Sequence, residues 1–295
     1  MKKIIKKIIK KFLGLNKFDD YVDIGYYWSD SFKDSIFKCD INQNLKRLKA
    51  NLPEDSKKVI DLVLERLIFL IPRKNQKILI HKNTLFSEYE LSLQEKILRE
   101  KTYEKYPFKY HYFTSETYFF HNGIKFLNKN NIDNFITNNV ILDVGAYNGD
   151  SAYIFSLYNP KQIISIEADK NNFLALSENI KKFNLKNVLP LNKMIDSINS
   201  IDNIIKDLWG GESQKIGFIK MDIEGSEMMA LNGATNTIIN HKPILAISIY
   251  HNVEQFFGAK IFLENLNLGY NFRIIKLSIF HPSDEIYLLA IPNGD

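Results

Sequence analysis

The sequence predicts an α/β protein with a doubly wound, mostly parallel β-sheet and a small helical domain in front of it. Two observations support this prediction. From residue 140 onward, short apolar runs alternate with helical patterns, as successive βαβ units would produce. The first 114 residues contain helical patterns instead. We therefore expect a mainly helical accessory region at residues 1–114 and an α/β domain at residues 115–295.

Length and composition predict a two-part globular protein inside the cell. A chain of 295 residues with 45% hydrophobic side chains can form one full-sized domain and a smaller companion. Its single cysteine, Cys39, cannot form an internal disulfide, which favours a reducing compartment. No apolar run reaches the roughly 20 residues of a membrane-spanning helix, and no secretory signal opens the chain. We expect a cytoplasmic protein.

The positive charge is concentrated at the beginning of the chain. Seven of the 39 basic residues precede Asp19, the first acidic residue, so the remainder carries slightly more acid than base. Nucleic-acid binding normally needs a broad basic face on the folded domain. We therefore expect no nucleic-acid partner.

The first 15 residues, MKKIIKKIIKKFLGL, alternate pairs of lysines with apolar residues. On a helix, the isoleucines, Phe12 and Leu13 would share one face and the lysines the other. Such a helix can lie on an anionic membrane, where each lysine near the surface contributes about 1 kcal/mol. It can equally dock on the body of the protein. Peripheral contact through residues 1–15 with the inner face of the membrane is therefore one of two open alternatives.

Two further helices are expected in the accessory region. Pro53 at a first-turn position, followed by apolar residues at helical spacing, predicts a helix that ends before Pro72. A second helix is expected from about Leu91 to Tyr103. The aromatic-rich run 103–118 would join this region to the α/β domain.

The α/β domain should contain seven strands. They are expected at residues 140–145, 162–167, 187–191, 216–222, 243–250, 271–277 and 285–291, with helices starting near residues 151, 170, 226 and 253 and a helical stretch between residues 191 and 216. In doubly wound sheets, ligands bind beyond the carboxyl ends of the strands. The polar residues directly after each strand are thus the candidate site residues.

The loop after the first of these strands has the sequence DVGAYNGDS, from Asp143 to Ser151. Glycine lets the backbone turn sharply and approach a ligand, and Asp150 or Ser151 can cap the next helix. A dinucleotide fingerprint would need G-x-G-x-x-G to hold a pyrophosphate, whereas this loop offers only Gly145 and Gly149. A nucleoside without phosphates, such as S-adenosylmethionine, fits better. A simple strand-to-helix turn is the alternative.

The second strand ends in Glu167, about 20 residues after the glycine loop. An acidic residue at this offset binds ribose hydroxyls in nucleotide-binding folds, because a carboxylate can accept from two vicinal hydroxyls. The alternative is a solvated strand end. Loop and acid together are more specific than either alone.

Candidate acceptor-side residues follow the fourth and fifth strands. Asp222 and Glu224 alternate along what we expect to be an extended strand, so they should project to the same side. His251 follows the fifth strand and would lie beside them if the two strands are neighbours. A histidine with a pKa near 6.5 suits general-base catalysis on a hydroxyl group. Glu227 is interpreted as structural, in the first turn of the next helix.

A metal ion is not expected. Asp222 and Glu224 are oxygen ligands of the kind that Mg²⁺ accepts. Two carboxylates alone do not establish a metal site, so we predict none.

Several of these motifs together resemble the FkbM family of methyltransferases. They are ILDVGAYNGDSA, the strand end IEAD, FIKMDIEGSEMMALNGA, KPILAISIYHN and an upstream SETYFFHNGIKFL. The resemblance covers about Ser115 to Pro292. It implies a class I methyltransferase with a Rossmann-like fold, S-adenosyl-L-methionine as cofactor, and hydroxyl groups of sugars, lipids or polyketides as methyl acceptors.

The resemblance also assigns residues to roles. Asp222, Glu224 and His251 would face the acceptor as catalytic residues. The expected cofactor-binding residues are Glu116, His121, Asn122, Asp143, Gly145, Ala146, Tyr147, Asn148, Gly149, Asp150, Ser151, Glu167 and Asp222. The segment before SIDNII, which in relatives helps to wall the adenine, is shorter here than the family pattern leads us to expect. Asn192 and Asp196 are its candidate adenine contacts.

The reaction expected from these residues is an in-line displacement. An acceptor oxygen would attack the sulfonium methyl group and lose its proton to His251 or to one of the carboxylates. Family habit and the basic amphipathic start favour a small-molecule or glycan acceptor, such as a lipid-linked surface-polysaccharide precursor. A nicotinamide-dependent oxidoreductase and a non-catalytic binding protein on the same fold are the alternatives. The oligomeric state is left open.

Overall fold

The structure is a computed structural model that describes residues 21–23, 32, 35–36, 38–70, 79–108, 114–210, 214–282 and 284–293. The basic segment 1–15 lies outside these residues, so its contact with a membrane stays a prediction. Among the helices described, none combines the length and apolar character needed to span a bilayer.

A seven-stranded sheet forms the centre of the molecule, in the order β5-β4-β3-β6-β7-β9-β8. Strands β3 to β7 run parallel, and β9 is inserted antiparallel between β7 and β8. Their bounds are β3 Val140–Val144, β4 Gln162–Glu167, β5 Val188–Asn192, β6 Ile216–Met221, β7 Ile244–Ser248, β8 Tyr270–Lys276 and β9 Ile286–Pro292. The central strands β3, β6 and β7 are buried along their whole length, as parallel strands covered on both faces require. The predicted doubly wound α/β fold is confirmed.

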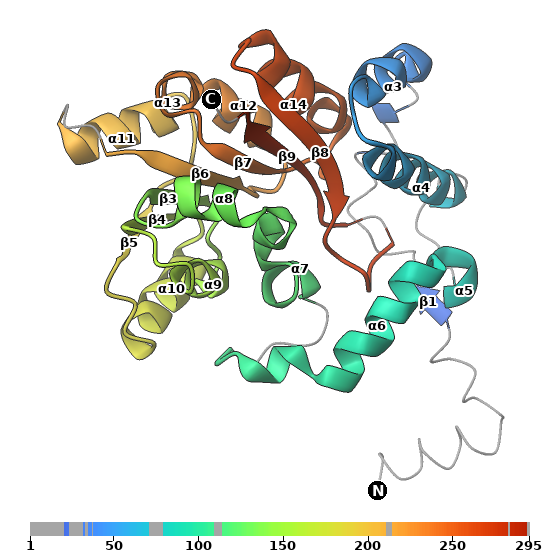
Figure 1. Cartoon of the computed structure of the whole chain (residues 1–295), viewed down its shortest axis with the longest axis horizontal. Helices are drawn as coiled ribbons and strands as arrows, with labels where there is room; N and C mark the ends of the chain where they lie inside the picture. Colours follow the sequence, from blue (N-terminus) through green and yellow to red (C-terminus); the bar gives the residue numbers. More distant parts are fainter. Residues whose placement is uncertain are drawn as a thin grey trace, which may run out of the picture.

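Helices cover both faces of this sheet (Figure 1). On one face lie α9 (Asp150–Ser156) and α10 (Lys170–Lys182). On the other lie α11 (Ile201–Trp209), α12 (Glu227–Asn232), α13 (Thr235–His241) and α14 (Val253–Asn265). A lead-in of short helices precedes β3, consisting of α7 (Ser115–Tyr118), η3 (His121–Phe126), α8 (Lys129–Asn131) and η4 (Ile132–Ile136). The break between α12 and α13 was not predicted from the sequence.

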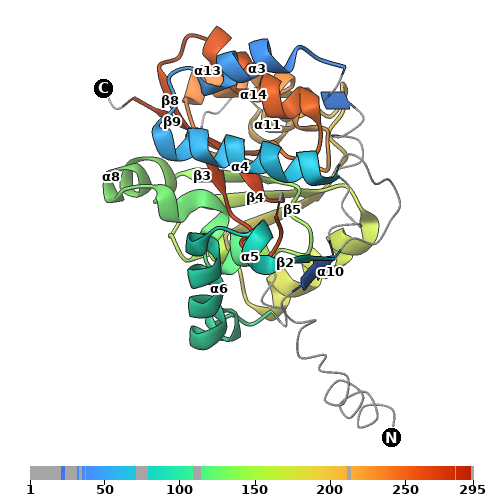
Figure 2. The ribbon, with the colours of Figure 1, turned by 90° about the vertical axis from the view of Figure 1, so that its right-hand side faces the viewer.

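The N-terminal elements include α4, which packs against β8 at the edge of the sheet, and α3, which packs against α14 (Figure 2). They are β1 (Tyr21–Asp23), α3 (Ile41–Lys49), α4 (Glu54–Leu70), β2 (Leu79–His81), α5 (Lys82–Leu85), α6 (Glu88–Glu100) and η2 (Thr102–Lys105). Ser56 on α4 accepts a hydrogen bond from the Ile274 amide on β8 at 3.0 Å. Phe32 meets Phe256 of α14 edge-on, with ring centroids 5.2 Å apart. The expected boundary at residue 115 stays a prediction, and the buried apolar residues on its two sides form one core.

The helix predicted after Pro53 is α4, which ends before Pro72 as expected. The second predicted helix, α6, begins three residues earlier than Leu91 and ends at Glu100. Its true start is set by Ser87, which forms a capping box with Glu90. Lys101 then ends the helix in the left-handed conformation, so the periodic pattern to Tyr103 overestimated its length.

Three side chains form hydrogen bonds to the connection between β8 and β9. Two of them belong to helices of the N-terminal region, and the third lies at the beginning of the α/β domain. Ser115 Oγ donates to the Leu277 carbonyl at 2.8 Å. Gln94 Nε2 on α6 donates to the Ile279 carbonyl at 2.5 Å, and Arg66 Nη1 on α4 donates to the Pro282 carbonyl at 2.7 Å. This connection leads directly into Glu285, which lines the site described next.

Candidate active site

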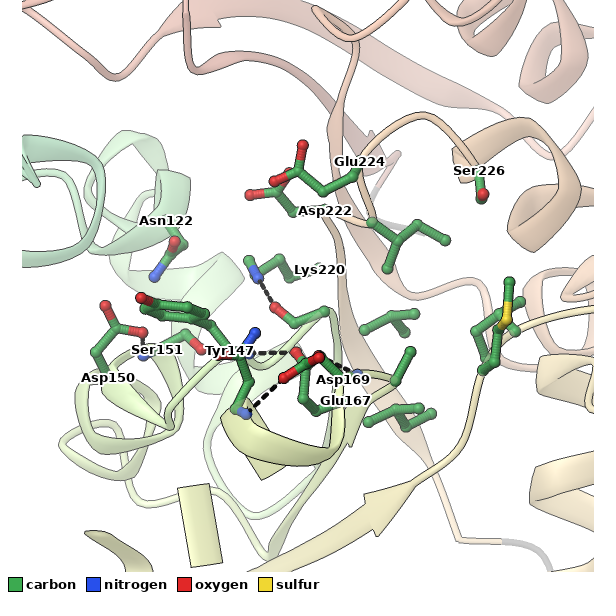
Figure 3. Close-up of a pocket in the computed structure, with 18 of the residues that line it drawn as sticks. Asn122, Tyr147, Asp150, Ser151, Glu167, Asp169, Lys220, Asp222, Glu224 and Ser226 are labelled. Atoms are coloured by element: carbon green, nitrogen blue, oxygen red, sulfur yellow. Dashed lines mark hydrogen bonds between the residues drawn. The ribbon is translucent and has the colours of Figure 1, made fainter. Parts of the chain in front are cut away.

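A cavity of about 510 Å³ opens at the carboxyl ends of the strands (Figure 3). It lies at the switch point of the sheet, because β4 and β5 extend to one side of β3 while β6 and β7 lie on the other. Ligands bind at such switch points in doubly wound sheets. The lining comes from the loops after β3 to β7, from α7 and η3, and from the residue before β9.

The loop after β3 approaches the turn after β6 so closely that only glycine fits at its first position. Gly145 has a φ of 85°, and a Cβ there would lie 1.8 Å from the Asp222 carbonyl oxygen. The amides of Gly145 and Ala146 both donate to the Ile166 carbonyl, at 2.9 and 3.0 Å. The loop is therefore fixed between β4 and β6, and the half-exposed Tyr147 lies over the cavity.

Glu167 lines the cavity at the end of β4 and also orders the glycine loop. Its Oε2 accepts from the Tyr147 amide and its Oε1 from the Asp169 amide, both at 2.8 Å. Each carboxylate oxygen has a second lone pair, so both oxygens can still accept from ligand hydroxyls. The geometry expected for ribose binding is therefore present.

Lys220, a buried lysine that was not predicted as a site residue, lies beside this loop. Lys220 Nζ donates to the Gly145 carbonyl at 2.7 Å and lies 3.3 Å from Asp143 Oδ1. Asp143 in turn accepts from Ser151 Oγ at 2.6 Å. Burial opposes the charge of Lys220, but Asp143 and other nearby carboxylates outweigh it and raise its pKa to about 12. Lys220 is thus a fixed cation at the cavity wall (Figure 3).

Asp222 and Glu224 do not lie on an extended strand, so that part of our expectation is wrong. Strand β6 ends at Met221, and residues 222–225 form a turn in which Glu224 has φ 53° and Gly225 has φ 110°. A left-handed glutamate is costly and persists only where its surroundings hold it. The two carboxylates still lie side by side (Figure 3), because the turn orients them rather than strand alternation.

His251 lies beside both carboxylates, as predicted for neighbouring strands. Strands β6 and β7 are paired, and His251 Nε2 lies 3.7 Å from Asp222 Oδ1 and 3.4 Å from Glu224 Oε2. Burial lowers the pKa of His251, but the hydrogen bond to Glu227 and the nearby Asp222 outweigh it and raise the pKa to about 9. In this arrangement the imidazole is protonated at neutral pH.

Further carboxyl groups complete this side of the cavity. Tyr250 donates to Glu285 Oε1 and Tyr287 donates to Asp222 Oδ2, both at 2.8 Å. Burial, followed by repulsion from Asp222, raises the pKa of Glu285 to about 8. Burial, followed by repulsion from Glu285, raises the pKa of Glu116 well above its usual range. Glu285 on this wall is therefore mostly protonated at neutral pH.

Most of the predicted site residues line the cavity. These are Glu116, Asn122, Gly145, Tyr147, Asp150, Ser151, Glu167, Asp222 and Glu224. The other predicted residues are not part of the lining; they are His121, Asp143, Ala146, Asn148, Gly149 and His251.

Two sets of predicted contacts are placed differently from what we expected. His121 is held between the hydroxyl groups of Tyr106 and Tyr158, at 3.0 and 2.6 Å, and burial lowers its pKa to about 4. Asn192 and Asp196, the candidate adenine contacts, are bonded to neighbouring backbone. The residues between them, 193–195, line the cavity instead.

The lining also contains Lys220, Tyr250 and Glu285, which were not predicted from the sequence. The contact that Glu227 makes with His251 was not predicted either. A charged residue inside the apolar run IGFIKM was a usable signal for Lys220, because a buried lysine needs partners. Glu285 offered no such signal. It reaches the site only because β9 runs antiparallel and begins at the edge where β6 and β7 end.

One group of side chains in the described part of the chain has the spacing of a metal site. Asp222, Glu227 and His251 each offer an atom within 4.8 Å of the others. Glu227 already accepts from the amides of Ile223 and Gly225, at 2.8 and 3.1 Å, and from Gln255 Nε2. The predicted absence of a metal therefore stays a prediction.

The strand order, the antiparallel β9 beside β7 and the cavity at the switch point define the class I, Rossmann-like methyltransferase fold. Within it, residues 190–274 match the model of the methyltransferase FkbM domain. The resemblance to the FkbM family is thereby confirmed, and this family agrees with the expected cofactor, S-adenosylmethionine. No curated protein matches the chain.

The chain is similar to several solved structures at low sequence identity. A methyltransferase FkbM from Methylobacillus flagellatus KT superposes with a TM-score of 0.59 and 19% identity, covering 90% of this chain. The match spans 62% of that protein. An rRNA methylase from Streptococcus thermophilus gives a TM-score of 0.42 and 11% identity, over 56% of this chain and 93% of the other. TrmK from M. capricolum, solved with S-adenosyl-homocysteine, gives 0.37 and 16%, over 57% and 69%.

Proposed function

We propose that the protein is an S-adenosylmethionine-dependent methyltransferase that methylates a hydroxyl group of a sugar or glycan. One observation carries the proposal: a single cavity joins the Gly145 loop and Glu167 on one side to Asp222 and Glu224 on the other. The first pair of features suits a nucleoside, and the second suits a hydroxyl acceptor. The FkbM match over residues 190–274 supports the same assignment.

The cofactor would lie across the ends of β3 and β4. Glu167 would accept from the ribose hydroxyls, and residues 193–195 would border the adenine. Lys220 offers a cation to the methionine carboxylate, and Glu116 and Asp150 offer carboxyl groups to its ammonium. The bound cofactor supplies the electrophilic methyl group.

The acceptor would enter against the carboxyl wall. Carboxylates accept hydrogen bonds from sugar hydroxyls, which favours a polyhydroxylated acceptor. His251 Nε2 would take the proton of the attacking hydroxyl by way of Asp222 or Glu224 at the cavity wall, once the imidazole is neutral. A sulfonium in the cavity lowers the pKa of His251 because like charges disfavour each other. Cofactor binding therefore shifts the histidine toward the form that acts as a base.

The first test is calorimetric titration of the full chain with S-adenosylhomocysteine, with NAD as comparison ligand. We expect micromolar binding of S-adenosylhomocysteine alone. Glu167→Ala should weaken this binding at least about tenfold, the effect of losing one or two charge-assisted hydrogen bonds. Glu178→Ala, which removes an exposed glutamate of α10, is the matched control and should bind normally.

Two outcomes would contradict the proposal. Binding of NAD in place of S-adenosylhomocysteine would favour an oxidoreductase, and binding of neither would favour a non-catalytic protein on this fold. After positive binding, transfer of a labelled methyl group to a panel of neutral glycosides tests the acceptor class.

A further inference from the structure

Glu227 is the most completely bonded carboxylate near the site, although it does not line the cavity. Its side chain is fully buried at the start of α12. Oε1 accepts from the Ile223 amide at 2.8 Å and lies 3.0 Å from His251 Nδ1. Oε2 accepts from the Gly225 amide at 3.1 Å and from Gln255 Nε2. One carboxylate thus contacts two different active-site turns.

The first of these turns, residues 222–225, holds Asp222 and Glu224. Its left-handed Glu224 lies between the two amides that Glu227 binds. Such a conformation needs surrounding support, and the two hydrogen bonds from these amides to Glu227 provide it. The second turn is tied to the first as well, since Asn252 Nδ2 donates to the Gly225 carbonyl at 3.1 Å.

The contact with His251 fixes which ring nitrogen faces the site. A neutral imidazole has one N–H donor and one acceptor nitrogen. If Nδ1–H donates to Glu227, Nε2 is the acceptor, and Nε2 is the nitrogen nearest Asp222 and Glu224. A carboxylate that orients a histidine in this way is the arrangement used in hydrolytic triads on other folds.

We propose that Glu227 is a positioning residue. It binds His251 through Nδ1, directs Nε2 toward Asp222 and Glu224, and holds the 222–225 turn that carries these two carboxylates next to the imidazole. The proposal rests on the proposed function only in taking Nε2 as the proton acceptor. Glu227 itself touches neither the cavity nor the reacting atoms. It acts through His251 and through the turn.

The test is NMR titration of the His251 imidazole in the full chain, with His251→Gln used to assign its resonances. The groups facing this ring are Asp222, Glu224, Glu227, Ser248, Tyr250, Asp284 and Glu285. Nitrogen shifts above the pKa should show the Nδ1–H tautomer. In Glu227→Gln the pKa should fall by roughly 1–3 units, the usual effect of losing an adjacent opposite charge.

Glu254→Gln, an exposed glutamate of α14, is the matched control and should leave the titration unchanged. Glu227→Asp keeps the charge and should restore part of the lost shift. An Nε2–H tautomer in the unmodified protein would overturn the proposal, as would an unchanged pKa in Glu227→Gln. If that variant does not fold, the tautomer of the unmodified protein still decides.

Binding of S-adenosylhomocysteine separates this proposal from the proposed function. Glu227→Gln should still bind it, because Gly145 and Glu167 on the cofactor side of the cavity make no contact with Glu227. If the unmodified protein does not bind it, the proposed function fails, whereas the titration still tests the role of Glu227.

Discussion

His251 shows how one side chain depends on neighbours from several parts of the chain. Its carboxylate partners come from the turn after β6 and from the first turn of α12, and Tyr250 stacks against it with ring centroids 4.2 Å apart. These neighbours raise its pKa to about 9 against the effect of burial. A general base must lose this proton before it can act, so its activity should depend strongly on pH.

We expect His251→Ala to lower turnover by about 10²–10⁴, the usual contribution of a general base. In the unmodified protein, turnover should rise as pH increases through the pKa of His251, and this limb should vanish in the variant. Initial rates of methyl transfer between pH 6 and 10 measure both effects. His241→Ala, at the opposite end of the sheet beside Ile216, is the control. Unchanged turnover in a folded His251→Ala variant would remove the histidine from the mechanism.

Sequence patterns located the site residues that directly follow parallel strands. Glu167 and His251 were found because strand ends are readable as the last residues of apolar runs. Asp222 and Glu224 were placed correctly for an incorrect reason, since no pattern reveals that β6 stops at Met221. Lys220 was missed because its partners come from β3 and its loop, 75 or more residues away in the sequence.

At the scale of elements, α4 and α6 are joined to the β8–β9 connection by a buried ion-pair group. Arg66 on α4 contacts Glu90 on α6 through both carboxylate oxygens, at 3.0 and 2.5 Å. Lys276 on β8 lies 3.2 Å from the same carboxylate. Helical periodicity predicted these helices, but it could not predict that their charged residues face inward.

We expect Arg66→Met to destabilise the protein by about 3–5 kcal/mol, because it leaves a buried carboxylate without its bidentate partner. Urea denaturation followed by circular dichroism measures the free energy of unfolding. Arg99→Met, which removes an exposed arginine of α6, should have little effect. A loss below about 1 kcal/mol, the range of exposed pairs, would show that this ion pair does not hold the helices in place.

At the scale of the whole molecule, three groups at or near the site remain protonated in the folded protein at pH values at which the unfolded chain would release their protons. The pKa values of Asp284, Glu285 and His251 are raised to about 7, 8 and 9. A raised folded-state pKa gives stability that is complete below the unfolded value and is lost as pH rises through the folded value. Between pH 6.5 and 8 all three groups act in this direction. The lowered pKa values of His121 and His281, about 4, and of Lys276, about 8, have the opposite effect on stability, the histidines mainly below pH 6.5 and the lysine mainly above pH 8.

The free energy of unfolding should therefore decrease between pH 6.5 and 8, by on the order of 2 kcal/mol. Glu285→Gln keeps an acceptor for Tyr250 but cannot ionise, so it should flatten this decrease. Urea titrations at several pH values compare it with Glu254→Gln, which should behave like the unmodified protein. A free energy of unfolding that stays constant or rises between pH 6.5 and 8 would show that these raised pKa values do not govern stability.

The hydrogen bonds that hold the β8–β9 connection bear on how proteins of this fold diverge. Gln94, Arg66 and Ser115 hold the backbone that leads into Glu285, yet two of them belong to helices far from the catalytic strands in sequence. Under the proposed function, substitutions in α4 and α6 would shift Glu285 in the acceptor wall while the Gly145 loop stays untouched. Substitutions in the accessory region are then one way to change the acceptor. Chimeras that exchange this region between relatives should exchange their acceptor selectivity as well.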